Sequence, residues 1–185
     1  MEIIVNPYKD SGRGVDWDEQ TPKIISEMNL YFSQNKETLN FSLLETDHGT
    51  SADWPTITIT IGGGIGALFI IPEAHKRIRE SFEEWKRIGN EITSLITWIA
   101  SKYPVVAYPK ELLFFDLLEW FETELGIDVN ELEFISVDDE FPIPDKRYGM
   151  SIDKAYLFTL KNKKVVYQIA IQNDREIIWK HSYEI

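Results

Sequence analysis

The residues best suited to acid–base chemistry or metal binding lie in a polar stretch between two predicted strands. His48 is there with Glu45, Asp47 and Asp53, and it is one of three histidines in the chain. An imidazole beside carboxylates can transfer protons or hold a metal ion. The spacing matches no known ligand pattern, and polar loops are common at strand ends. We therefore assign this loop only to an alternative function, in which it would be the site of a small-ligand sensor or an enzyme.

A glycine-rich stretch follows the clearest strand pattern in the chain. Residues 56–61 alternate threonine with isoleucine, and Gly62, Gly64 and Ala67 then fit the pattern G-x-G-x-x-A. In a dinucleotide site such glycines let the backbone approach a phosphate at a helix N-terminus. Pro72 falls where that helix should be well under way, so the pattern favours a simple bend. The alternative ligand set is Asp47, His48, Asp53, Gly62 and Gly64.

Four carboxylates near the end of another predicted strand have the chemistry to bind a divalent cation. They are Asp138, Asp139, Glu140 and Asp145. The calcium-loop pattern with its central glycine is missing, so we predict no metal site and no cofactor. The chain also has no cysteine, which excludes thiol catalysis and disulfides, and it has no G-x-S-x-G motif. These observations favour a protein that is not an enzyme.

Charge is the strongest signal in the sequence. The chain of 185 residues has 31 acids, 19 bases and a formal net charge of -12. Residues 111–145, the acidic window, contain twelve Asp and Glu and no Lys or Arg. Removing these twelve leaves 19 acids, which the 19 bases balance. Such a concentration of negative charge favours a partner protein with a basic surface, and it argues against nucleic acid and anionic membranes as partners.

A predicted helix carries the first part of the acidic window. It should run from about Pro109 to Leu125, because proline suits a first turn and Gly126 suits a helix end. Most apolar residues fall on one side of this helix, but Leu112 and Phe115 project among the carboxylates. Either a second layer of the fold covers them, or Phe115 is an exposed anchor for a basic partner. The second hypothesis gives a partner-binding set of Leu112, Phe115, Asp116, Glu119, Glu122, Asp138, Asp139 and Glu140.

The remaining elements follow from hydrophobic periodicity and from proline and glycine signals. They are strands at 3–5, 39–43, 56–61 and 132–137, a helix capped by Thr21 and Pro22 that ends near Gln34, a long amphipathic helix from Pro72 to about Ser101, an extended connector at 103–109, and a three-stranded meander at 155–183. We expect an α+β fold in which an antiparallel sheet packs against the long helix and the acidic helix. The length fits one domain, with a possible C-terminal subdomain at 127–185.

The function predicted from these features is that of an acidic protein-binding module. It would neutralise or regulate a basic partner protein, as inhibitors and immunity proteins do. The alternatives are the ligand sensor or enzyme described above, and a structural subunit that assembles through the long helix. The sequence has no signal-peptide pattern and no run of roughly 18 apolar residues, so a cytoplasmic protein is expected.

Overall fold

The computed structural model describes residues 2–6, 17–34, 40–47, 55–62, 94–103, 105–143 and 153–185. These residues form an α+β fold with two four-stranded sheets in which every pairing is antiparallel. The first sheet has the order β2 (Asn40–Asp47), β3 (Pro55–Gly62), β1 (Glu2–Val5), β4 (Val105–Ala107). The second has the order β5 (Leu132–Asp138), β6 (Ala155–Asn162), β7 (Val165–Gln172), β8 (Ile177–Glu184).

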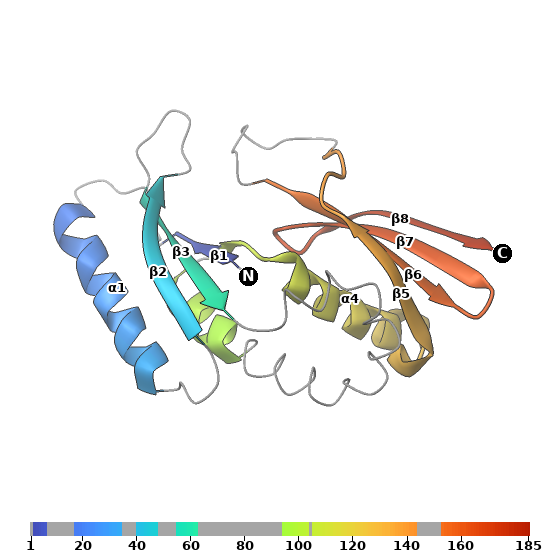
Figure 1. Cartoon of the computed structure of the whole chain (residues 1–185), viewed down its shortest axis with the longest axis horizontal. Helices are drawn as coiled ribbons and strands as arrows, with labels where there is room; N and C mark the ends of the chain where they lie inside the picture. The colour runs from blue at the N-terminus through green and yellow to red at the C-terminus, as the bar shows by residue number, and fades with distance from the viewer. Residues whose placement is uncertain are drawn as a thin grey trace.

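The helices are α1 (Trp17–Gln34), α4 (Lys110–Leu125), the 3-10 turn η2 (Val129–Glu131) and a helical segment at 94–102. Figure 1 shows the first sheet beside α1 at the left and the second sheet above α4 at the right.

Isoleucines on one face of β3 form the centre of the first sheet's core. The register pairs Ile59 with Ile3 and Ile57 with Val5, so these side chains share a face. Met28 of α1 and residues 96 and 99 of the helical segment complete this first cluster. The alternation of threonine and isoleucine therefore predicts the strand and the face in this core, but not that Thr56 and Thr58 on the other face are buried too.

Two local predictions around this sheet are wrong. Helix α1 begins at Trp17, so Thr21 is not its cap and Pro22 lies inside it. The missing N–H of Pro22 costs one hydrogen bond near the helix start, and burial of Met28 and Phe32 offsets that loss. The predicted connector contains β4, which pairs with β1 through the partners Ile4 and Ala107.

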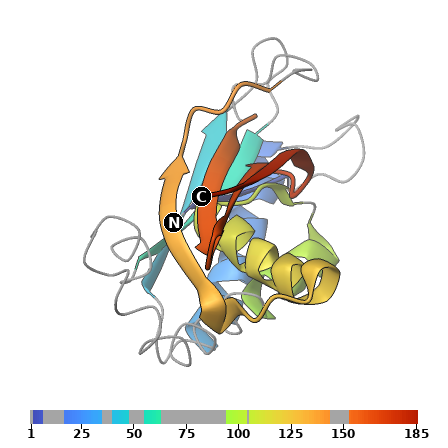
Figure 2. The ribbon, with the colours of Figure 1, turned by 90° about the vertical axis from the view of Figure 1, so that its right-hand side faces the viewer.

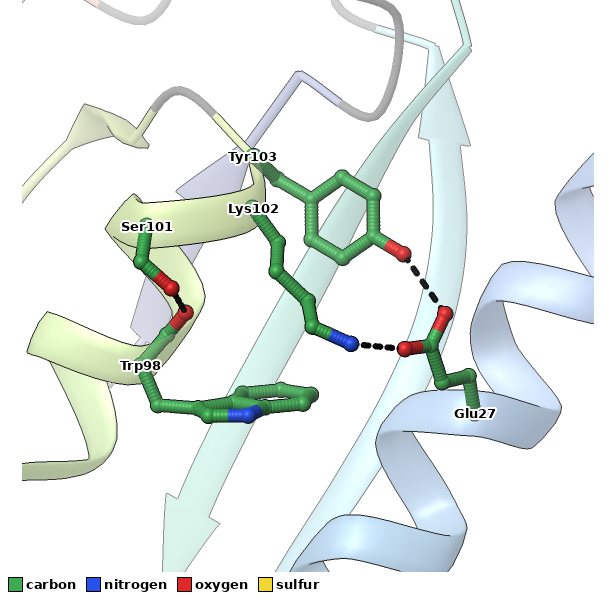
Figure 3. Close-up of polar contacts among 5 residues, drawn as sticks. All are labelled: Glu27, Trp98, Ser101, Lys102 and Tyr103. Atoms are coloured by element: carbon green, nitrogen blue, oxygen red, sulfur yellow. Dashed lines mark hydrogen bonds and ion pairs between the residues drawn. The ribbon is translucent and has the colours of Figure 1, made fainter.

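The C-terminal end of the predicted long helix is confirmed, because residues 94–102 are helical. Its residues 72–93 lie outside the described part of the chain. Trp98 stacks on Tyr31 of α1, with ring centroids 3.7 Å apart and an interplanar angle of 5°. Beside this stack, Lys102 and Tyr103 both donate to the carboxylate of Glu27, the tyrosine at 3.1 Å (Figure 3). These contacts hold α1 and the helical segment together over the first sheet.

The contacts of Glu27 shift two ionisation equilibria. The hydrogen bonds from Lys102 and Tyr103 lower the pKa of the Glu27 carboxyl. Burial and the same carboxylate raise the pKa of the Tyr103 hydroxyl to about 12. The glutamate is therefore favoured as the anion and the tyrosine as the neutral phenol.

The second sheet contains the predicted meander as β6, β7 and β8, and β5 adds the fourth strand. The predicted turns are confirmed, because β6 pairs with β7 along its full length and β7 pairs with β8, with a register shift at Ile178. Phe134, Phe158 and Ile169 meet Phe121 of α4 in a second cluster. Figure 2 shows α4 lying against one face of this sheet. The possible subdomain at 127–185 stays a prediction, and the cluster that would be its core includes residues of α4 that precede it.

Candidate functional site

Helix α4 positions the first part of the acidic window, and its predicted bounds are confirmed. It runs from Lys110 to Leu125 with Pro109 as its N-cap. Gly126 follows in the left-handed conformation at φ 64°. The N–H of Gly126 and that of Ile127 both reach the carbonyl oxygen of Phe121, the latter at 3.0 Å. Glycine suits this position because it has no Cβ to strain a positive φ.

The first turns of α4 are covered by both sheets. Leu112 is buried in the first cluster, and Phe115 is half-buried against both clusters. Leu113 and Phe114 are buried in the second cluster. The first cluster, which contains residues of the first sheet, α1 and the helical segment, is thus the second layer that the sequence leaves open. Leu112 and Phe115 are packing residues, which corrects the hypothesis that Phe115 is an exposed anchor.

Bases from outside the acidic window neutralise part of it in space. Three of its acids form ion pairs, Asp116 with Arg175, Asp139 with Lys110, and Glu131 with Lys163. A fourth, Glu133, lies opposite Lys161 in the register of β5 and β6. Lys161, Lys163 and Arg175 follow the window in sequence and Lys110 directly precedes it, so a run of acids without bases overstates the charge of the folded surface.

The pair of Asp116 and Arg175 has two hydrogen bonds and joins α4 to the turn between β7 and β8. The Nε and Nη2 atoms of Arg175 donate to the two carboxylate oxygens at 2.7 and 2.6 Å. The guanidinium also lies over the Tyr108 ring, 5.3 Å from its centroid. Burial raises the pKa of the Asp116 carboxyl, and the guanidinium offsets only part of that effect. Asp116 therefore has a structural partner, as does Asp139.

The exposed carboxylates of α4 lie beyond the part that the first sheet covers. Leu112, Phe115, Glu119 and Glu122 follow one another on a single side of the helix at spacings of three and four residues. The first two are covered, whereas Glu119 and Glu122 are exposed. Leu125 lies three residues after Glu122, between that glutamate and the apolar side of the helix, and 43% of its surface is exposed. We call Glu119, Glu122 and Leu125 the α4 acidic face.

The 100° step of a helix places Leu125 with Leu118 and Phe121 on the predicted apolar side of α4, so sequence reasoning misses its exposure. The apolar side of a helix is buried only along the length that another element covers. Gly126 ends the helix just after Leu125. An apolar residue in the last turn, next to a glycine stop, is the signal that could have identified it.

The acids after β5 lie apart from the α4 acidic face. Asp138, Asp139 and Glu140 are exposed, and Asp139 binds Lys110 in the first turn of α4 at 2.7 and 2.9 Å. Lys110 and Glu122 are twelve helical residues apart, about 18 Å at 1.5 Å per residue. The structure therefore divides the predicted partner-binding set between the two ends of α4.

The alternative ligand set falls mostly outside the described residues. Asp47 is the last residue of β2, and Gly62 is the last residue of β3. His48, Asp53 and Gly64 lie outside the described ranges, so a site in that loop stays a prediction. Asp145 of the four candidate metal ligands also lies outside them. Within the described ranges, no three or more acids and histidines are grouped in a way that could hold a metal ion.

The described helices include none that is both long enough and apolar enough to cross a membrane. Comparison with known proteins finds no family model that matches the chain, no curated protein similar to it and no solved structure similar to it.

Proposed function

We propose that this protein binds a basic partner protein through the α4 acidic face and thereby neutralises or regulates it. The observation that supports the proposal is the placement of exposed carboxylates at the negative end of a helix. Glu122 and Glu124 lie in the last turn of α4, which contains no basic residue of its own. Glu119 and Glu122 are also like-charged neighbours at a spacing of three residues.

This arrangement costs the free protein stability. A carboxylate at a helix C-terminus opposes the helix dipole by about 0.3–1 kcal/mol, and a like-charged pair adds a few tenths. Residues that weaken their own element without a compensating contact often serve a function. A cation from a partner would remove the repulsion and oppose the charge of the helix end.

Leu125 supplies the apolar part of the proposed interface. It is exposed in the last turn of α4, next to Glu122 on the helix surface. Interfaces gain most of their affinity from apolar or aromatic contacts at the centre, while the surrounding charges set orientation and association rate. Leu125 therefore takes the role that the sequence suggested for Phe115.

A capture experiment with charge-reversal variants tests the proposal. Wild-type protein, Glu122→Lys and Glu45→Lys are immobilised and exposed to a lysate of the source cells at low ionic strength. Glu45 is an exposed glutamate on β2, so its variant matches the charge change on another element. We expect a basic protein that wild type and Glu45→Lys retain and Glu122→Lys loses. Equal retention of every captured protein by both variants would contradict the proposal.

A further inference from the structure

Strand β8 is an exposed edge of the second sheet. It is the last strand in the order β5-β6-β7-β8, and no described strand pairs with its outer side. Figure 1 shows it ending at the C-terminus, at the far right of the molecule. Every residue from Trp179 to Ile185 is exposed. A long exposed edge offers unpaired backbone groups to another strand.

The hydrogen bonds of β8 identify which backbone groups point outward. The N–H of Ile185 donates to the carbonyl of Lys164 at 2.8 Å, next to the register pair of Val165 and Glu184. Backbone groups alternate in direction along a strand. Residues 179, 181, 183 and 185 therefore direct their N–H and C=O groups toward β7. Lys180, Ser182 and Glu184 direct theirs outward.

The side chains of β8 form an aromatic row on the face of the sheet opposite α4. His181 lies between Trp179 and Tyr183, with ring centroids 5.7 and 5.8 Å away. Trp179, Tyr183 and Ile185 have 39%, 44% and 63% of their surfaces exposed. They are three of the seven large apolar residues that are exposed in the described part of the chain. Phe141 contacts Trp179, with ring centroids 5.7 Å apart, and leaves it partly exposed. In the described part of the chain, the edge thus combines backbone groups that no strand pairs with and an exposed apolar row.

We propose that β8 pairs in antiparallel orientation with β8 of a second copy of this chain, about a two-fold axis at Ser182. In that register Lys180 of each copy stands directly opposite Glu184 of the other. Both belong to the outward-pointing set, so these pairs and the central Ser182 pair can exchange about six backbone hydrogen bonds. The two second sheets then become one continuous sheet.

Side chains on both faces fit the same register. Lys180 and Glu184 lie on the face toward α4, where Lys180 already sits 5.2 Å from the centre of the Trp120 ring. Opposite charges that face each other across a strand pair are favourable. On the other face Trp179 meets Ile185 of the second copy, and His181 meets Tyr183. The exposed apolar row is thereby covered by itself.

Neighbouring registers lose these matches. A shift by one residue places outward groups against inward ones, so the backbone bonds do not form. An axis at His181 retains the bonds but sets Ile178 opposite Glu184 and leaves Lys180 opposite Ser182. Charge and apolar pattern together therefore select the axis at Ser182.

Sedimentation of charge-reversal variants tests the dimer. Wild type is measured at about 100 µM, where a dimer with a Kd of about 1 µM would be almost wholly associated. We expect a dimer for wild type and for Lys154→Glu, a control on an exposed lysine outside β8. Lys180→Glu and Glu184→Lys should each be monomeric, because each places like charges opposite one another twice.

Mixing the two monomeric variants gives the sharpest result. In a pair of one Lys180→Glu chain and one Glu184→Lys chain, both cross-strand contacts again join opposite charges. We expect the equimolar mixture to regain the dimer, which also shows that both variants are folded. A monomeric wild type, a dimer that survives either single reversal, or a mixture that stays monomeric would overturn the proposal.

Discussion

Leu112 and Leu113 are neighbours in α4, yet they are buried in different hydrophobic clusters. Leu112 belongs to the core of the first sheet and Leu113 to the core of the second. Successive residues of a helix point about 100° apart, so one helix can serve two cores only where both sheets reach it. The first turns of α4 therefore join the two sheets, and its last turns extend beyond the first.

Phe115→Ala should destabilise the protein, because Phe115 packs against both clusters. A fully buried phenylalanine costs about 3–5 kcal/mol when truncated, and for this half-buried one we expect about 2–3 kcal/mol. Leu125→Ala is the control, with an expected change within about 0.5 kcal/mol. Urea unfolding measures both. A loss for Phe115→Ala as small as that of the control would revive the exposed-anchor hypothesis.

Local signals predict much of this fold. Pro109 and Gly126 mark the ends of α4, because each residue favours a particular local backbone conformation. The alternation around Ile59 marks β3, because it is a pattern within one short segment. The three-residue strand β4 was missed because it lies in a short segment bounded by prolines, where only its pairing with β1 reveals it. The start of α1 was missed because Pro22 favours a first turn without requiring one.

The candidate site was harder to predict, because its properties depend on contacts between distant residues. The helical pattern shows that Leu112 and Phe115 break the apolar side, but not that a second sheet covers them. Asp116 meets a base 59 residues away and Asp139 meets one 29 residues away. Neither pair is visible as a local pattern, because its two members lie in different parts of the fold. The net charge was therefore predictable, whereas its distribution over the surface was not.

The backbone of Arg175 has a left-handed conformation, which is unfavourable for any residue that has a Cβ atom. Its φ is 79°, which costs a residue with a Cβ about 1–2 kcal/mol relative to glycine. Arg175→Ala loses the ion pair with Asp116 and keeps this strain, whereas Arg175→Gly loses the pair and relieves it. We expect Arg175→Gly to be more stable than Arg175→Ala by about 1 kcal/mol in urea unfolding. Equal stability of the two variants would show that the backbone is not strained there.

Alkaline pH should weaken the contact between α1 and the helical segment at 94–102. The pKa of Tyr103 is raised from 10.0 to about 12, so the folded state favours the neutral phenol. A raised pKa contributes stability that is present below the unfolded value and is lost as pH rises through the folded one. The free energy of unfolding should fall between about pH 10 and pH 12.

Tyr103→Phe identifies the source of that fall. The variant should show a shallower loss of stability over this pH range, because the Tyr103 hydroxyl no longer titrates. Burial also raises the pKa of Tyr156 to about 12, so part of the loss should remain. Urea unfolding at a series of pH values measures the slope. An unchanged slope in Tyr103→Phe would contradict the assignment.

Removing charge from the α4 acidic face should stabilise the free protein. Glu119→Gln combined with Glu122→Gln relieves the like-charge pair and part of the conflict with the helix dipole. We expect a gain of about 0.5–1 kcal/mol in the free energy of unfolding. Glu45→Gln on β2 is the single-charge control and should change stability by less. A double variant with a lower free energy of unfolding than wild type would mean that these carboxylates stabilise the folded protein.

The most direct test of the proposed function is the association rate of the captured basic partner as ionic strength rises. Attraction over long distances is screened within about 10 Å at 0.1 M salt, so the rate should fall steeply between low and physiological salt. Glu122→Lys should associate more slowly than wild type at low salt and show a weaker salt dependence, while Glu45→Lys should behave like wild type. An association rate that is independent of salt, or equal slowing by Glu122→Lys and Glu45→Lys, would contradict docking through the α4 acidic face.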